Sequence, residues 1–169
     1  MSQPNNDASI TDAKRIEEIA KLRLHEDQVD EILNEYAQKA SETFNLPVSL
    51  ISIVLDEAQI FAASHGLEGW MLDTGGTPVE WSFCANSVKS GEPFIVENAK
   101  EHDVVKDNPL VKVDGIQCYA GAPMVTSNNF IIGNFCVIGK EKRTFSEDDI
   151  KKLKDFDNEA VKRIEERVK

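Results

Sequence analysis

The chain has 169 residues, the usual size of one domain. With 41% hydrophobic and 29% charged residues, its composition is that of a globular protein and argues against a disordered chain. The formal net charge of -11 opposes binding to nucleic acids and to anionic membranes, because both kinds of binding rely on lysine and arginine.

Cysteine usage and the lack of long apolar runs predict a cytoplasmic protein. Cys84, Cys118 and Cys136 are far apart and lie in apolar stretches, which is typical of reduced buried thiols. They form no CxxC pair, so no structural zinc site is predicted. The N-terminal residues lack the apolar core of a signal peptide, and no run approaches the roughly 20 apolar residues of a membrane span.

The first 47 residues predict two helices after a flexible start. Residues 1–10 are polar, and helical periodicity begins near Thr11 and ends near Leu24. A better-defined apolar stripe runs from Val29 to Phe44 with the spacing of one helix face. Pro47 ends this helix, since proline disfavours the helical conformation in the residue before it.

A β-hairpin and a loop follow. Residues 48–55 (VSLISIVL) are suited to a strand buried on both faces, and residues 59–64 predict its antiparallel partner. The glycine-rich residues 65–78 predict a loop, with one helical turn around Trp70 and Met71.

The middle of the chain predicts short elements. Residues 82–89 have the length of a short helix, with Ser82 as its N-cap and Gly91 as its stop. Residues 93–96 predict a strand. Residues 98–112 are polar and predict one or two helical turns, interrupted by Pro109.

The last third predicts a second hairpin and a long helix. Residues 116–126 and 130–138 predict antiparallel strands, in which Cys118 and Cys136 approach one another if they point to the same face. Ser146 and Asp149 form a carboxylate variant of the capping box, which marks the start of the last helix. Its apolar stripe runs to the C-terminus and has one polar interruption, at Asp157.

This order of elements predicts an α+β domain with a mainly antiparallel sheet, because hairpins outnumber βαβ crossovers. We expect residues 1–10 to be a flexible N-terminus and residues 11–169 to be a single domain that includes the flanking helices.

Four segments resemble the GAF domain family. They are SFCANSVKSGEPFIVENA from Ser82, DNPLV from Asp107, CYAGAPM from Cys118 and IIGNFCVIGKEKRTFSEDDIKKL from Ile131. The similarity runs from about Tyr36 to Ile164. It implies a sheet of five or six antiparallel strands, with the N- and C-terminal helices on one face. Short helices and loops would cover a small-molecule pocket on the other face.

By this resemblance, the residues expected to line the pocket come from the glycine-rich loop, the short helices and the central strand. Gly121 leaves room beside Tyr119, which points into the pocket or packs as a core aromatic. The candidate ligand-binding residues are Trp70, Trp81, Phe83, Cys84, Asp107, Asn108 and Tyr119.

The resemblance favours a non-catalytic sensor that binds an unidentified small molecule and signals through partner contacts or a homodimer formed by the terminal helices. Two alternatives remain open. One is a cysteine-dependent enzyme similar to the GAF-type methionine-sulfoxide reductases, and the other is a pure dimerisation module. The sequence contains no HExxH, GxSxG or other catalytic signature, and it identifies neither a cofactor nor a metal.

Overall fold

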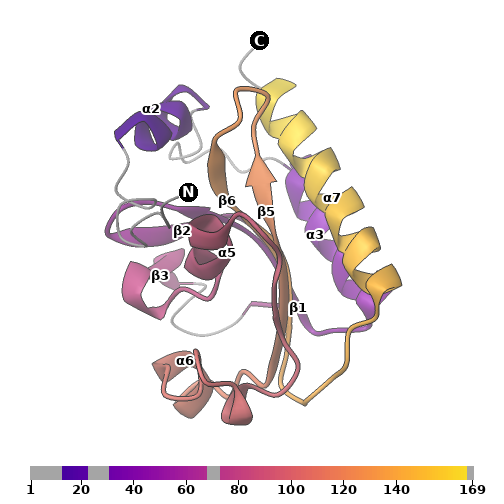
Figure 1. Ribbon diagram of the computed structural model, residues 1–169. Coiled ribbons are helices and arrows are strands. Elements are labelled where there is room, and N and C mark those ends of the chain that lie inside the picture. The colour runs from indigo at the N-terminus through magenta and orange to yellow at the C-terminus, as the bar shows by residue number, and fades with distance from the viewer. Residues whose placement is uncertain (1–12, 23–30, 68–72, 167–169) are drawn as a thin grey trace.

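Six strands form one antiparallel sheet, with helices on both of its faces (Figure 1). The computed structural model describes residues 13–22, 31–67 and 73–166. The predicted flexible N-terminus and the predicted turn at Trp70 and Met71 lie outside the described residues. The strand order is β3-β2-β1-β6-β5-β4, and every neighbouring pair is antiparallel. The strands are β1 (Val48–Val54), β2 (Ala58–His65), β3 (Gly76–Pro78), β4 (Phe94–Val96), β5 (Cys118–Val125) and β6 (Ile131–Gly139).

Both faces of the sheet are buried, which explains why its central strands are apolar at nearly every position. Successive side chains of a strand point to opposite faces. In β1, Ile51 and Ile53 join the core on one face, whereas Leu50 and Val54 join the core on the other. The register of β5 and β6 continues both layers, and places Tyr119 opposite Ile138 and Gly121 opposite Cys136.

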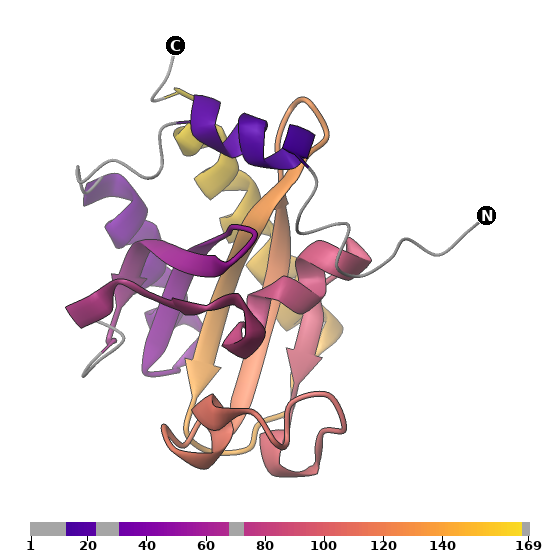
Figure 2. The ribbon, with the colours of Figure 1, turned by 90° about the vertical axis from the view of Figure 1, so that its left-hand side faces the viewer.

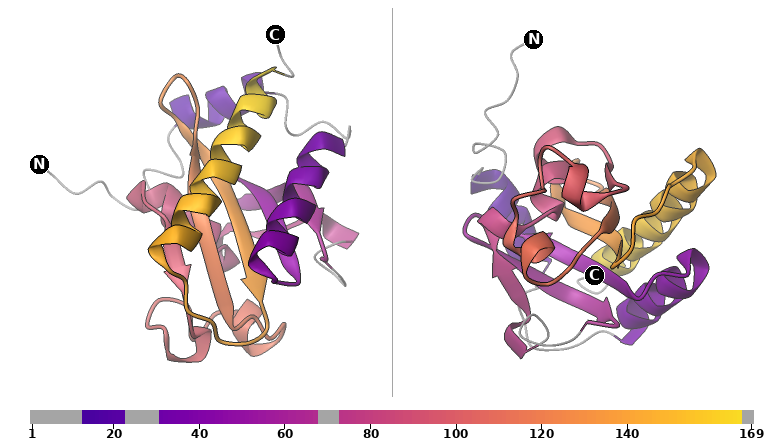
Figure 3. Two further views of the ribbon diagram at one scale, coloured as in Figure 1. Left: turned by 90° about the vertical axis from the view of Figure 1, so that its right-hand side faces the viewer. Right: turned by 90° about the horizontal axis from the view of Figure 1, so that it is seen from below.

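Two long helices, α3 (Glu31–Phe44) and α7 (Glu147–Glu166), lie side by side on one face (Figure 3). Their apolar stripes pack onto the sheet through buried residues such as Leu33 and Leu153. The predicted capping box at the start of α7 is present. The Ser146 hydroxyl accepts from the Asp149 amide at 3.1 Å, and the Asp149 carboxylate accepts from the Ser146 amide at 2.9 Å.

The first helix, α2 (Ala13–Lys21), lies apart from α3 and α7, at the end of the sheet beside the β5–β6 hairpin (Figure 2). Buried Arg15 donates to the backbone oxygens of Val54 at 2.6 Å and Ile131 at 3.3 Å. The Glu18 carboxylate accepts from Asn128 at 3.1 Å. These polar contacts, together with Ile19, which is buried in the core, hold α2 against β1 and the β5–β6 hairpin.

Short elements cover the opposite face. They are η1 (Val79–Trp81), α5 (Cys84–Ser90), η2 (Ala99–Glu101) and α6 (Pro109–Lys112). The Ser82 hydroxyl accepts from the Ala85 amide at 3.1 Å, which is the predicted capping of α5. Gly91 ends α5 in the left-handed conformation, with a φ of 75°.

The predicted α+β fold is confirmed, with two local differences. The loop of residues 65–78 ends in a short edge strand, β3, which pairs with β2. Pro109 begins α6 instead of interrupting a helix, because its missing N–H is not needed at the first helical position. Within the described residues, no helix combines the length and the apolar character needed to span a bilayer.

The polar interruption of α7 is a buried carboxylic acid. Asp157 is 5% exposed, and its Oδ1 has no hydrogen-bond partner among the described residues. Burial raises the pKa of this carboxyl from 3.8 to about 8. At neutral pH, Asp157 is therefore mostly protonated in the folded protein, whereas the same carboxyl is ionised in the unfolded chain.

Replacing Asp157 with asparagine is expected to remove a pH-dependent loss of stability. Between about pH 4 and pH 8 the unfolded carboxyl is ionised and the folded one is protonated, so each unit of rising pH costs about 1.4 kcal/mol of folding stability. Urea unfolding across this range measures the effect. D157N should be more stable than the wild type at pH 8, and this advantage should shrink toward pH 4. D155N, at an exposed aspartate of the same helix, is the control, and parallel curves for wild type and D157N would contradict the account.

Candidate ligand pocket

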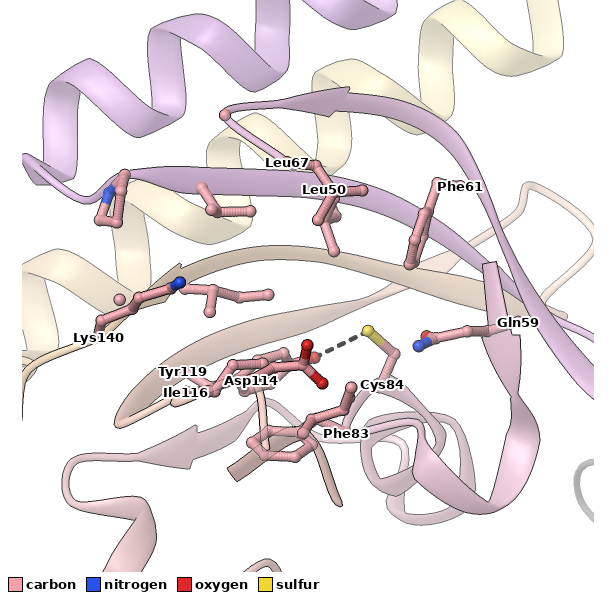
Figure 4. A pocket seen from close by; sticks show the side chains of 16 residues that line it. Leu50, Gln59, Phe61, Leu67, Phe83, Cys84, Asp114, Ile116, Tyr119 and Lys140 are labelled. Atoms are coloured by element: carbon pink, nitrogen blue, oxygen red, sulfur yellow. Dashed lines mark hydrogen bonds between the residues drawn. The ribbon is translucent and has the colours of Figure 1, made fainter. Parts of the chain in front are cut away.

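The face of the sheet opposite α3 and α7 carries a cavity of about 310 Å³. In Figure 4, Leu50, Phe61 and Leu67 line one wall, and Phe83, Ile116 and Tyr119 line the other. Gln59 and Lys140 lie toward opposite ends, with Asp114 between them. The remaining lining residues are Pro47, Val48, Gly66, Cys84, Leu110, Ile138 and Gly139. A largely apolar hollow with a few polar groups is the usual form of a small-molecule site.

A buried hydrogen-bonded network lies beside the cavity. Tyr119, 1% exposed, places its hydroxyl 3.1 Å from the Cys84 sulfur and 3.0 Å from Asn134 Oδ1. The Asn134 amide donates to the Ser87 hydroxyl, which donates to the Cys84 backbone oxygen at 2.9 Å. The network thus joins β5 and β6 to α5 and holds the helix over the sheet.

A second chain of hydrogen bonds joins α5 to the outer strands. Ser82 donates to Gln59 Oε1 at 2.7 Å, and Gln59 Nε2 donates to Thr77 at 2.7 Å. All three side chains are buried. Gln59 lines the cavity, so its orientation there is fixed by Ser82 on one side and Thr77 on the other.

Burial and neighbouring groups shift the pKa values of three groups in the network. Burial raises the pKa of Tyr119 well above its ordinary value, and the nearby Cys84 and Cys136 sulfurs raise it further, so the hydroxyl remains a proton donor. Burial also raises the pKa of Cys136 well above its ordinary value. Burial opposes ionisation of Cys84 too, but the nearby Cys136 thiol and the hydroxyls of Ser52, Tyr119 and Ser82 favour the thiolate and lower the pKa of Cys84.

Three of the seven residues expected at the site line the cavity: Phe83, Cys84 and Tyr119. The ring of Phe83 packs edge-on against Tyr119, with 5.2 Å between the ring centroids. Gly121 lies two residues after Tyr119 on the same face of β5. As expected, its missing side chain leaves space, which the Tyr119 hydroxyl and Asn134 occupy. Whether these residues bind a ligand stays a prediction.

The other predicted residues are placed differently. Trp70 lies outside the described residues. Asp107 is exposed and pairs with Lys112 at 3.4 Å, so its position is explained by surface charge. Asn108 caps α6 by accepting from the Leu110 amide at 2.9 Å and donates to the Trp81 backbone oxygen at 3.2 Å. Asn108 and Trp81 are therefore joined in the cover of the pocket without lining it.

The cavity-lining residues that come from β1 and β2, and those at the ends of the pocket, were not predicted from the sequence. The main ones are Leu50, Gln59, Phe61, Asp114 and Lys140. Only the alternation within β1 and β2 could have indicated which of their side chains face the cover. The condition for Cys118 and Cys136 to approach one another, that both point to the same face of the sheet, is not met. Cys136 faces the pocket side with Tyr119, whereas Cys118 follows the opposite alternation with Ala120, so Cys84 is the neighbour of Cys136.

The fold and the cavity define an α+β domain with paired helices behind a sheet and a covered pocket in front of it. The GAF domain model matches residues 28–162, and the chain belongs to the GAF domain family. A cyclic di-GMP phosphodiesterase of Pseudomonas aeruginosa is 35% identical over an alignment of 148 residues, and the match covers 86% of this chain and 24% of that protein. The chain thus spans about a quarter of that relative.

Solved structures share the fold at low sequence identity. The GAF domain region of a putative membrane protein from Geobacter sulfurreducens superposes with a TM-score of 0.67 and 15% identity, covering 88% of this chain and 98% of that one. A type II free methionine-R-sulfoxide reductase from Thermoplasma acidophilum gives a TM-score of 0.65 and 14% identity, covering 80% of this chain and 92% of that one.

Substituting Gly121 with alanine is expected to disrupt the buried network. The added Cβ would lie 2.3 Å from Asn134 Oδ1 and 2.4 Å from the Tyr119 hydroxyl, so both side chains must move. Such overpacking costs about 1–3 kcal/mol, which urea unfolding measures. Removing the hydroxyl with Y119F relieves one of the two clashes. G121A should therefore cost less in the Y119F background, and additive effects of the two substitutions would contradict this geometry.

Proposed function

We propose that this GAF domain is a non-catalytic sensor that binds a small molecule in the cavity between α5 and the sheet. The observation that carries the proposal is the cavity of about 310 Å³, apolar along its walls and bordered by polar groups held in fixed orientations. Among the described residues, no group of three or more His, Cys, Asp or Glu side chains could hold a metal ion. The relative from P. aeruginosa is much longer, and we propose a regulatory role for the shared region.

The charges at the cavity favour a ligand with an apolar body and charged groups of both signs. The cavity lining includes one cationic side chain, Lys140, and one anionic side chain, Asp114. An anionic group of the ligand would lie near Lys140 and a cationic group near Asp114, with the apolar body between Leu50 and Tyr119.

Native mass spectrometry of protein purified from cells is the direct test, since it detects a copurified molecule. Adding the identified compound at 100 times its Kd should stabilise the folded state by about 2.7 kcal/mol and raise the Tm. L67W, which places a large ring at a wall of the cavity, should abolish this rise. V125W, at a 41% exposed residue outside the cavity lining, should retain it. An unchanged ligand-induced rise in L67W would contradict binding in this cavity.

The enzyme alternative has one supporting observation, the Cys84 thiol in the cavity lining. The non-catalytic proposal predicts that free methionine-R-sulfoxide leaves the thiols of the purified protein unchanged in a thiol assay. Stoichiometric loss of thiols with formation of methionine would favour the reductase instead.

We further infer that the domain forms a homodimer through α3 and α7, which lie side by side on the face away from the pocket. Among the described residues of α3 and α7, Ile32 on α3 is the large apolar side chain that is exposed, at 37%. Light scattering after size-exclusion chromatography should give twice the mass of the 18.9 kDa chain. I32D should shift the protein toward the monomer, and E35Q, at an exposed residue one turn away, should not. A monomer at all concentrations would exclude this interface and the pure dimerisation module.

A further inference from the structure

Two cysteines lie together on the pocket side of the sheet. Cys84 is the first residue of α5 and lines the cavity, so small molecules that enter the cavity reach its sulfur. Cys136 lies on β6 beneath α5, in the same buried cluster as Cys84. It is paired with Gly121, and the Tyr119 hydroxyl occupies the space over Gly121, 3.1 Å from the Cys84 sulfur, so Cys136 and Cys84 lie on two sides of the same hydroxyl. Neither forms a disulfide.

The surroundings of Cys84 are those of an anion site. The Tyr119 hydroxyl lies 3.1 Å from the Cys84 sulfur. Ser52, on the pocket-facing side of β1 with Leu50 and Val54, is fully buried, and its hydroxyl has no hydrogen-bond partner among the described residues. A buried hydroxyl without a partner is costly. Ser52 is paired with Asn134 in the register of β1 and β6, beside the network that includes Cys84, so an ionised Cys84 sulfur would offer the Ser52 hydroxyl an acceptor.

Cys118 provides the contrast within the same chain. It faces the other side of the sheet, is fully buried and does not line the cavity. Burial raises the pKa of its thiol. Thiol reactivity follows the thiolate form and access, so Cys118 lacks both features that Cys84 has.

We propose that Cys84 and Cys136 form a redox-responsive thiol pair in the pocket, in which Cys84 reacts with a hydroperoxide and Cys136 then closes a disulfide. The proposal is independent of the identity of the ligand. It adds a second input to the pocket, because oxidation would join α5 covalently to β6 and withdraw the Cys84 sulfur from Tyr119.

The chemistry balances with the hydroperoxide as the sole oxidant. The Cys84 thiolate attacks one peroxide oxygen, an S–O bond forms, and the O–O bond breaks. The leaving alkoxide takes the proton that the thiol lost and departs as an alcohol. The Cys136 sulfur then attacks the Cys84 sulfur, an S–S bond forms, and the S–O bond breaks. The departing hydroxide takes the Cys136 proton and leaves as water, so two thiols lose two electrons to one hydroperoxide.

The test treats the whole protein with one equivalent of tert-butyl hydroperoxide, blocks the remaining thiols with N-ethylmaleimide in denaturant and maps the products by mass spectrometry. Cys118 and Cys136 share the tryptic peptide that follows Lys112, so a second cleavage with cyanogen bromide after Met124 separates them. We expect Cys84 linked to Cys136, Cys118 alkylated, and Cys84 consumed roughly tenfold faster than Cys118.

Two variants isolate the steps. In C136A the first step proceeds without the second, so dimedone should trap a sulfenic acid on Cys84. In C84S, neither Cys136 nor Cys118 should react at low peroxide. Oxidation of Cys118 as fast as Cys84, or oxidised wild-type protein without the Cys84–Cys136 link, would overturn the proposal. The mapping in the wild type decides the question even when a variant fails to fold.

Discussion

The pocket side of this domain depends on one constraint: polar groups buried between α5 and the sheet must satisfy one another. Tyr119, Cys84, Asn134 and Ser87 do so through a continuous set of contacts. A buried donor or acceptor that loses its partner costs about 1–3 kcal/mol, so each member holds the others in place. Because the network spans β5, β6 and α5, it fixes the position of the helix that forms one wall of the cavity.

The two faces of the sheet solve different problems. The face under α3 and α7 is almost wholly apolar, and its notable exception, Asp157, remains neutral through burial. The other face carries Ser52, Asn134, Cys136 and Tyr119 among apolar neighbours. This is the face on which we propose that a ligand is oriented and a thiol reacts. A ligand in the cavity and a change in the redox state of Cys84 would both act on α5, so we propose this short helix as the element that reports on the pocket.

Local signals in the sequence predicted the elements well. The stripe from Val29 to Phe44 and the capping box at Ser146 depend on neighbours within a turn or two, and the structure contains both helices. Gly121 indicated the space beside Tyr119 for the same reason. The cavity was only partly predictable, because Gln59 reaches it from β2 and Lys140 from the residue after β6, and the register of the sheet brings these distant parts of the sequence together. Asp107 and Asn108 were predicted as ligand-binding residues from the family resemblance alone. In the structure, Asp107 forms an ion pair and Asn108 caps a helix, and these local roles account for their positions.

The measurement that tests this account most directly is hydrogen–deuterium exchange of backbone amides in wild type and Y119F. Loss of the Tyr119 hydroxyl removes the contacts to Cys84 and Asn134 while leaving the ring in place. We predict that amides of α5 exchange faster in Y119F, whereas those of α3 and α7 keep the protection of the wild type. Unchanged exchange in α5, or an equal loss of protection on both faces of the sheet, would contradict the claim that this network holds the helix over the pocket.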